Sequence, residues 1–284
     1  MRDEAQVYAS RLAQLASDCL IEEAVLTPKP GLVDLRGSGA HKDLSLPLMK
    51  ISAQTLKPMF EKMALDSWRK PLDLDLRESI GKTGREAEAL MLKATGGVNT
   101  HRGAIWTMGL LVSTSASIGG KCSENELAQR SAHLANLPDR FAKTFASHGS
   151  KVKAIYKVPG AKEEAQQGFP HVLDVALPSL RQARQKGKSE EHCRLDVLLT
   201  LMSSLSDTCV LYRAGWEGLK VTREGASAVL QAGGFGTELG EAIFYSWEKK
   251  MLSQNISPGG SADLLAATLF VDRLSTVYEE QSEN

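Results

Sequence analysis

The sequence predicts an all-α globular fold of about ten helices, and two observations support this prediction. Apolar residues recur at helical spacing along almost the whole chain, as in the stripe formed by Tyr8, Leu12, Leu15 and Cys19. No segment has the sustained alternation of polar and apolar residues that marks a half-buried strand. No fixed-period repeat is visible either, so we do not expect a solenoid.

Local signals place the helices in chain order. Ser123 and Glu126 form a capping box that starts a helix, and Pro138 suits the first turn of the next one. Glycines at 233–234 and 259–260 supply the breaks before the last two helices. The expected segments are a first helix that ends before Pro28, Ile51 to Trp68, Leu76 to Leu92, Ile105 to Ile118, a helix that ends before Pro138, 161–186, 190–212, 235–254 and 261–280.

Composition limits the domain count and the class of partner. A chain of 284 residues with 42% hydrophobic content can bury a sizeable core, and we find no linker, so residues 1–284 are predicted to form a single domain. Lysine plus arginine equals aspartate plus glutamate, at 34 each. No bulk field therefore favours nucleic acid or a membrane surface, and neither is expected as a partner.

The expected location is the cytoplasm. The chain begins with Met-Arg-Asp-Glu and has no apolar signal region, and no later segment is long enough to span a bilayer. Its four cysteines are widely spaced and form no metal-ligand pattern, as expected for reduced thiols.

Two loops near residues 28–43 and 95–102 are richer in glycine and charge than a helix connection requires, so we expect function there. In the second loop, Gly96 and Gly97 let backbone N–H groups approach a ligand, and the helix that follows favours an anion at its start. A plain glycine cap would explain these glycines. It would not explain the four polar side chains that follow, which are Asn99, Thr100, His101 and Arg102.

The first loop carries charge on a stiffened backbone. Two prolines, at positions 28 and 30, lead into a segment with carboxylates, a histidine and cations. A solvated loop could have the same composition, but the prolines directly after a core helix favour a site. Its candidate residues are Lys29, Asp34, Arg36, His41 and Asp43.

Four further candidates lie on helices or next to them. Glu88 precedes the glycine turn on the face that leads to it. Glu23 continues the apolar stripe of the first helix, so it either pairs with a nearby cation and braces the loop or acts in catalysis. Asp207 is the last residue of a small polar stripe, which is usually a solvated helix face, but Asp207 and the following Arg213 could border a cleft. Asp263 is explained by helix capping.

Together these segments resemble the triphosphoribosyl-dephospho-CoA synthase family. The resemblance covers about residues 20 to 270, and its motifs occur in one order along the chain. They are Thr27-Pro-Lys-Pro-Gly-Leu-Val-Asp34, Gly39-Ala-His-Lys-Asp43, Thr95-Gly-Gly-Val-Asn-Thr-His-Arg-Gly-Ala104, Gly168-Phe-Pro-His171, Ala176-Leu-Pro178, Asp207-Thr-Cys209 with Arg213, and Ser257-Pro-Gly-Gly-Ser-Ala-Asp-Leu264.

The resemblance implies an all-α enzyme that takes ATP and 3′-dephospho-CoA, releases adenine and joins the triphosphoribosyl unit to a ribose 2′-hydroxyl. The product is the precursor of the prosthetic group of malonate decarboxylase, which we prefer, or of citrate lyase. A separate holo-acyl-carrier-protein transferase then attaches it. Mg²⁺ is the implied cofactor, shared by carboxylates and phosphate oxygens.

This chemistry assigns tasks to the candidates. Asp34 or Asp43 would act as base or Mg²⁺ ligand, with Glu88 as the second carboxylate. His41 or His101 would assist the departure of adenine. The phosphates would be held by Lys29, Arg36, Arg102 and the N–H groups around Gly97. Asn99 and Thr100 would bind ribose or phosphate oxygens, and Asp207 and Arg213 would border the substrate cleft.

Two rival functions remain. A Mg²⁺-dependent all-α hydrolase of an ADP-ribose-like glycosidic bond would use a similar set of carboxylates. A non-catalytic nucleotide- or CoA-binding subunit would need fewer reactive groups than these loops provide.

Overall fold

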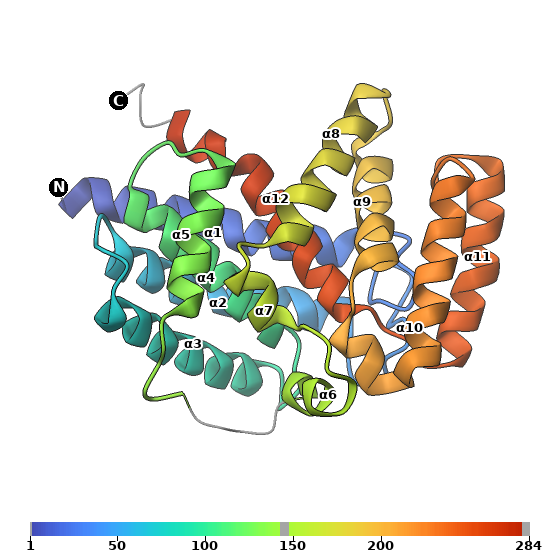
Figure 1. The fold of residues 1–284 in the computed structure, drawn as a ribbon, viewed down its shortest axis with the longest axis horizontal. Helices are drawn as coiled ribbons and strands as arrows, with labels where there is room; N and C mark the ends of the chain where they lie inside the picture. The colour runs from blue at the N-terminus through green and yellow to red at the C-terminus, as the bar shows by residue number, and fades with distance from the viewer. Residues whose placement is uncertain (1, 143–147, 280–284) are drawn as a thin grey trace.

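The structure, a computed structural model, describes residues 2–142 and 148–279, and these form helices joined by loops (Figure 1). The helices are α1 (Arg2–Val25), α2 (Leu46–Ser67), α3 (Leu74–Ala94), α4 (Arg102–Ile118), α5 (Glu124–Asn136), α6 (His148–Tyr156), α7 (Ala161–Gln166), η1 (His171–Ala176, a π-helix), α8 (Leu177–Gln185), α9 (Glu190–Ser204), α10 (Thr208–Gln231), α11 (Glu238–Ser253) and α12 (Gly259–Glu279). Extended structure in the described ranges is limited to one isolated bridge between Asp34 and Gly37. The predicted all-α fold is confirmed.

Helix α4 forms the centre of the fold. Nearly all of its residues from Ala104 to Ser117 are buried, and it packs against α1, α2, α3, α5 and α12. A helix that is apolar on all sides is stable only inside a core. The core therefore fixes the start of α4, where the glycine turn ends. The assignment of residues 1–284 to a single domain stays a prediction.

The other helices pack either against α4 or against one another. Helix α1 lies against α2 and α12, and α10 packs against α6, α9 and α11. In Figure 1, α10 and α11 form a hairpin at the right end of the molecule, and the first part of α10 lies close to α6. In the described residues, no individual helix combines the length and apolarity of a membrane span, although α9 and α10 together do so across a bend of 62°.

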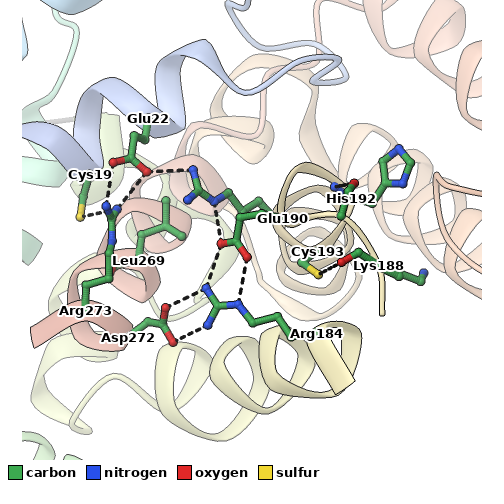
Figure 2. A network of polar contacts seen from close by, with 12 residues as sticks. Cys19, Glu22, Arg184, Lys188, Glu190, His192, Cys193, Leu269, Asp272 and Arg273 are labelled. Carbon is green, nitrogen blue, oxygen red and sulfur yellow. Dashed lines mark hydrogen bonds and ion pairs between the residues drawn. The ribbon is translucent and has the colours of Figure 1, made fainter. Parts of the chain in front are cut away.

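A network of charged side chains joins α1, α8, α9 and α12 (Figure 2). Glu22 accepts hydrogen bonds from Arg273 at 2.7 Å and from Arg194 at 2.8 Å. Cations and carboxylates then alternate along the order Arg273, Glu22, Arg194, Glu190, Arg184 and Asp272. Because single exposed pairs contribute little, the value of this network lies in fixing the relative orientation of four helices.

The prediction that a helix begins at Pro138 is wrong. Helix α5 starts at the predicted cap, where Ser123 Oγ accepts from the Glu126 N–H at 3.1 Å, but residues 137–142 after it are irregular. The reason is tertiary. Arg85 of α3 donates to Asp139 at 2.7 Å, and Glu78 of α3 binds Arg140 at 2.6 Å. These contacts hold the segment along α3, and a helix would turn the two side chains away from it.

Two long predicted helices are divided in the structure. Residues 161–186 form α7, η1 and α8, because Gly168 (φ 83°) and Phe169 (φ 61°) make a left-handed turn. The expected helix 190–212 ends at Ser204, and Asp207 caps α10, which continues to Gln231 with a kink at Gly215. Neither α6 nor most of α10 was predicted from periodicity.

Candidate active site

Asp34 and Arg36 hold the first loop in one conformation. The buried Asp34 carboxylate accepts from the Lys29 N–H at 2.9 Å, from the Arg36 N–H at 2.7 Å and from the Arg36 guanidinium at 2.7 and 2.9 Å. The same guanidinium forms two hydrogen bonds with Glu248 of α11, at 2.6 and 3.0 Å. Both side chains are thus engaged in shaping the loop and in tying it to α11.

Lys29 and Glu23 form a buried ion pair. Their side chains are 2% and 5% exposed, and Lys29 Nζ lies 2.5 Å from Glu23 Oε1 and 2.5 Å from the Glu23 carbonyl oxygen. Glu23 points into the interior, as predicted, and of the two interpretations offered for it the structure shows the pairing that braces the loop. The ammonium predicted to bind phosphate is enclosed by protein.

The glycine turn ends in a helix start, as predicted. Gly96 and Gly97 have φ of 65° and 92°, and α4 begins at Arg102. Asn99 Oδ1 accepts from the Arg102 N–H at 3.2 Å, and the Arg102 guanidinium lies 2.5 Å from Glu88. Glu88 and Arg102 are both more than one-third exposed, so this pair is accessible to a ligand.

His101 lies inside this turn with one free nitrogen. Thr100 donates to Ser52 at 2.6 Å, and Ser52 Oγ lies 2.7 Å from His101 Nδ1. Since Ser52 accepts from Thr100, its own hydrogen is available for Nδ1, which assigns the ring proton to Nε2. Nε2 is buried and has no hydrogen-bond partner in the described structure. Burial, and then the Lys29 cation, lower the pKa of His101 to about 4, so the ring is neutral at pH 7.

We expect the protein to lose stability as the pH falls from about 6.5 toward 4 because of His101. The pKa of this buried imidazole is lowered to about 4, so only the unfolded chain binds the proton in this window. The contribution of this group to the free energy of unfolding is fully present above the pKa of the unfolded state, and about 3 kcal/mol of it is lost by pH 4. Thermal unfolding of the wild type and of His101→Gln between pH 4 and 8 measures this. Equal pH dependence in both proteins would contradict the assignment.

His41 and Arg213 join the first loop to the start of α12. His41 Nε2 lies 2.7 Å from Ser257 Oγ, and Arg213 Nη1 lies 3.4 Å from His41 Nδ1. Burial, followed by the Arg213 cation, lowers the pKa of His41. Asp43 lies 3.6 Å from His41 and is 65% exposed. Arg213 also donates to the Ala40 carbonyl at 2.5 Å.

Asp207 connects two helix starts and does not face solvent. Its buried carboxylate caps α10 through the Cys209 N–H at 2.9 Å and reaches α12 through the Ser261 N–H at 2.8 Å. Burial raises the pKa of Asp207, and these hydrogen bonds oppose the rise. The carboxylate predicted to border a cleft therefore joins α10 to the segment 255–263.

The segment 255–263 was not assigned a role from sequence beyond capping, yet it lies between both loops. Ser257 contacts His41 of the first loop. Asp263 lies against Gly103 after the second loop, since a Cβ atom built on Gly103 would be 2.0 Å from Asp263 Oδ2. The sequence signal for this segment was the motif Ser257-Pro-Gly-Gly-Ser-Ala-Asp-Leu264 of the family resemblance.

The predicted Mg²⁺ ligands do not form one group. Among the described residues, no three histidine, cysteine, aspartate or glutamate side chains are close enough to hold a metal together. Asp34 is buried and bound by Arg36 and backbone donors, whereas the side chains of Asp43 and Glu88 are partly exposed. A Mg²⁺ ion that arrives on a triphosphate needs only one or two protein carboxylates, so the residues present suit a metal brought by the substrate.

Two surface hollows lie away from these loops. One, of about 450 Å³, is lined by residues of α10 and α11 that include Gly225 and Trp247, and the other, of about 200 Å³, by residues that include Asp66 and Asp73. The candidate site is therefore defined by converging polar groups and not by either hollow.

Comparison with known proteins identifies the family. The family described as ATP:dephospho-CoA triphosphoribosyl transferase matches residues 9–282. A Klebsiella pneumoniae protein named 2-(5''-triphosphoribosyl)-3'-dephosphocoenzyme-A synthase is 54% identical over 271 residues, which cover 95% of this chain and 97% of that protein. Proteins of Pseudomonas fluorescens and Stutzerimonas stutzeri, named as probable synthases of the same kind, are each 52% identical and cover 94% and 96% of this chain. No solved structure matches. The chain therefore belongs to the ATP:dephospho-CoA triphosphoribosyl transferase family of enzymes.

Proposed function

We propose that this enzyme converts ATP and 3′-dephospho-CoA to 2′-(5″-triphosphoribosyl)-3′-dephospho-CoA and releases adenine. The observation that carries the proposal is the 54% identity to a relative of that name across 95% of the chain. The gathering of the first loop, the glycine turn and the segment 255–263 around the start of α4 supports it, because all three contain motifs of the predicted resemblance.

The triphosphate is proposed to bind at the start of α4. Arg102 offers an accessible guanidinium, and Gly96 and Gly97 place no side chain over the backbone there. The first N–H groups of a helix attract anions. Glu88 or Asp43 would supply an oxygen ligand to Mg²⁺ held mainly by the phosphates. When bound, the metal would neutralise phosphate charge.

The reacting ribose is proposed to lie beyond the phosphates, near His101. Its neutral imidazole cannot act as a cationic acid at pH 7, because its pKa is lowered to about 4. The free Nε2–H can instead donate a hydrogen bond to the departing adenine or to the ribose. His41 remains the alternative donor, although its ring is already engaged with Ser257.

The experiment that tests the function mixes the purified enzyme with Mg-ATP and 3′-dephospho-CoA and identifies the products by mass spectrometry. Free adenine together with a triphosphoribosyl adduct of dephospho-CoA is the expected result. ADP or AMP would contradict it. Adenine released without dephospho-CoA would favour the hydrolase, and ATP binding without turnover would favour a non-catalytic subunit.

The destination of the product is also proposed. We favour the acyl carrier subunit of malonate decarboxylase over that of citrate lyase, with a separate transferase attaching the group in the cytoplasm. None of the four cysteines, all of which lie in the described ranges, forms a disulfide, as suits that reducing compartment. Incubating the product with each apo carrier subunit and its transferase distinguishes the two, since only the correct pair gains the mass of the prosthetic group.

Arg102→Ala is expected to raise the KM for ATP by roughly 10- to 100-fold, because a charge-assisted contact to phosphate is lost. The effect on kcat should be smaller. Arg181→Ala is the matched control, since Arg181 is similarly exposed and is paired with Glu124 as Arg102 is with Glu88. Steady-state kinetics with varied ATP measure both variants. An unchanged KM in Arg102→Ala would exclude the phosphate role.

A further inference from the structure

Asp263 is a carboxylate in the second turn of α12 that lies against the main chain at the start of α4. A Cβ atom on Gly103 would come within 2.0 Å of Asp263 Oδ2 and 3.2 Å of its Cγ. Because Gly103 has no side chain, the carboxylate can occupy the position that a Cβ atom would fill. The contact places a carboxylate from the far end of the sequence beside the glycine turn.

Asp263 has no assigned partner. In the described part of the chain it makes neither a hydrogen bond nor an ion pair, unlike Asp34, Glu88 and Asp207, each of which does. Its charged neighbours are the carboxylates of Glu23 and Asp207. Burial, and then these two negative charges, raise the pKa of Asp263 well above its ordinary value.

His101 is a second unsatisfied group in the same place. It is 2% exposed, its Nε2 has no partner in the described structure, and it lies two residues before Gly103. Lys29 connects the two groups, because it acts electrostatically on His101 and pairs with Glu23, which acts on Asp263. Unsatisfied polar groups inside a protein are costly, and a catalytic role is one of the reasons for which native proteins keep them.

We infer that Asp263 is the catalytic base that accepts the proton of the attacking 2′-hydroxyl of 3′-dephospho-CoA. The inference rests on the proposed function. Triphosphate bound at the start of α4 would bring the ribose of ATP alongside Gly103, and thus alongside the free carboxylate. Asp34 is buried, and both of its oxygens already accept hydrogen bonds within the loop, from Arg36 and from the Lys29 N–H.

The step balances as a group transfer. The oxygen of the 2′-hydroxyl forms a bond to C1 of the ATP ribose, and its proton passes to Asp263. The bond between C1 and N9 of adenine breaks, and its electron pair leaves with adenine, which takes one proton from water. Asp263 then returns its proton to water. A base with a raised affinity for protons suits this task near neutral pH.

The test compares Asp263→Asn and Asp263→Ala with the wild type in the product assay. We expect kcat to fall by about 10²- to 10⁴-fold in both, the usual range for losing a general base. Calorimetric binding of Mg-ATP should change by less than about threefold, since the base does not hold phosphate. Added formate should restore part of the activity of Asp263→Ala, because it fits the vacated carboxylate position.

Gly103→Ala provides a second test that leaves the carboxylate in place. The new methyl group would displace Asp263 while alanine improves helix propensity, so kcat should fall without a loss of thermal stability. Near-normal kcat in Asp263→Asn, with an active wild type, would overturn this inference alone. No adduct from the wild type would overturn the proposed function and the inference together. Loss of Mg-ATP binding without formate rescue would assign Asp263 to substrate binding and overturn its role as base.

Discussion

Lys29→Met is expected to destabilise the protein by about 3–5 kcal/mol, because it leaves the Glu23 carboxylate buried without a cation. The two side chains are 2% and 5% exposed and lie 2.5 Å apart. Solvent cannot replace the missing charge at such a site. Denaturant unfolding monitored by circular dichroism measures the change.

Two further variants make this prediction specific. Lys62→Met removes the similar pair with Glu86, whose side chains are both 43% exposed, and should cost less than about 1 kcal/mol. The double variant Glu23→Leu with Lys29→Met should recover most of the lost stability, because no unpaired charge remains. If the Lys29→Met protein were stable and failed only to bind ATP, the structural role would be contradicted and the phosphate-binding role predicted from the sequence would be supported.

Asp207→Ala is expected to cost about 2–5 kcal/mol and to reduce product formation in the protein that remains folded. The carboxylate caps α10 at the Cys209 N–H and also binds the N–H and hydroxyl of Ser261, at 2.8 and 3.0 Å. Its removal leaves buried donors unsatisfied at two helix starts. The second of these leads directly to Asp263.

Asp73→Ala is the matched control for Asp207. Asp73 caps α3 through a hydrogen bond from the Leu76 N–H at 2.9 Å, at an exposed position, so its loss should cost about 1 kcal/mol and leave kcat unchanged. Asp207→Asn keeps an acceptor oxygen and should fall between the two. Unfolding curves and adenine release at a temperature where all variants are folded measure both effects. Equal stability losses for Asp73→Ala and Asp207→Ala would show that Asp207 is only a cap.

The helices were predictable wherever one apolar stripe faced one core. The stripe of Tyr8, Leu12 and Cys19 is buried as expected, and the Ser123 cap starts α5. Prediction failed where a contact distant in sequence decided the local structure. Asp139 is held by α3, and Asp207 caps α10 while it also accepts hydrogen bonds from residues 260 and 261.

In the candidate site, too, features set by neighbouring residues were predictable, and features set by distant contacts were not. The glycine turn, the start of α4 at Arg102 and the inward direction of Glu23 all came from local patterns. Local patterns did not show whether a charged side chain is free or already paired. Lys29 and Asp34 resemble ligand-binding residues in the sequence, yet partners inside the protein occupy them.

The sequence by itself determined the all-α class, the family resemblance and the two loops on which the site is built. Periodicity, glycine conformation and motif order are properties of neighbouring residues, so they can be recognised without coordinates. Only the tertiary structure decided which polar groups are satisfied. Hydrogen bonding and ion pairing depend on which distant segments meet. The meeting of α12 with the start of α4 places Asp263 against Gly103, two residues after His101, whose Nε2 has no hydrogen-bond partner in the described structure.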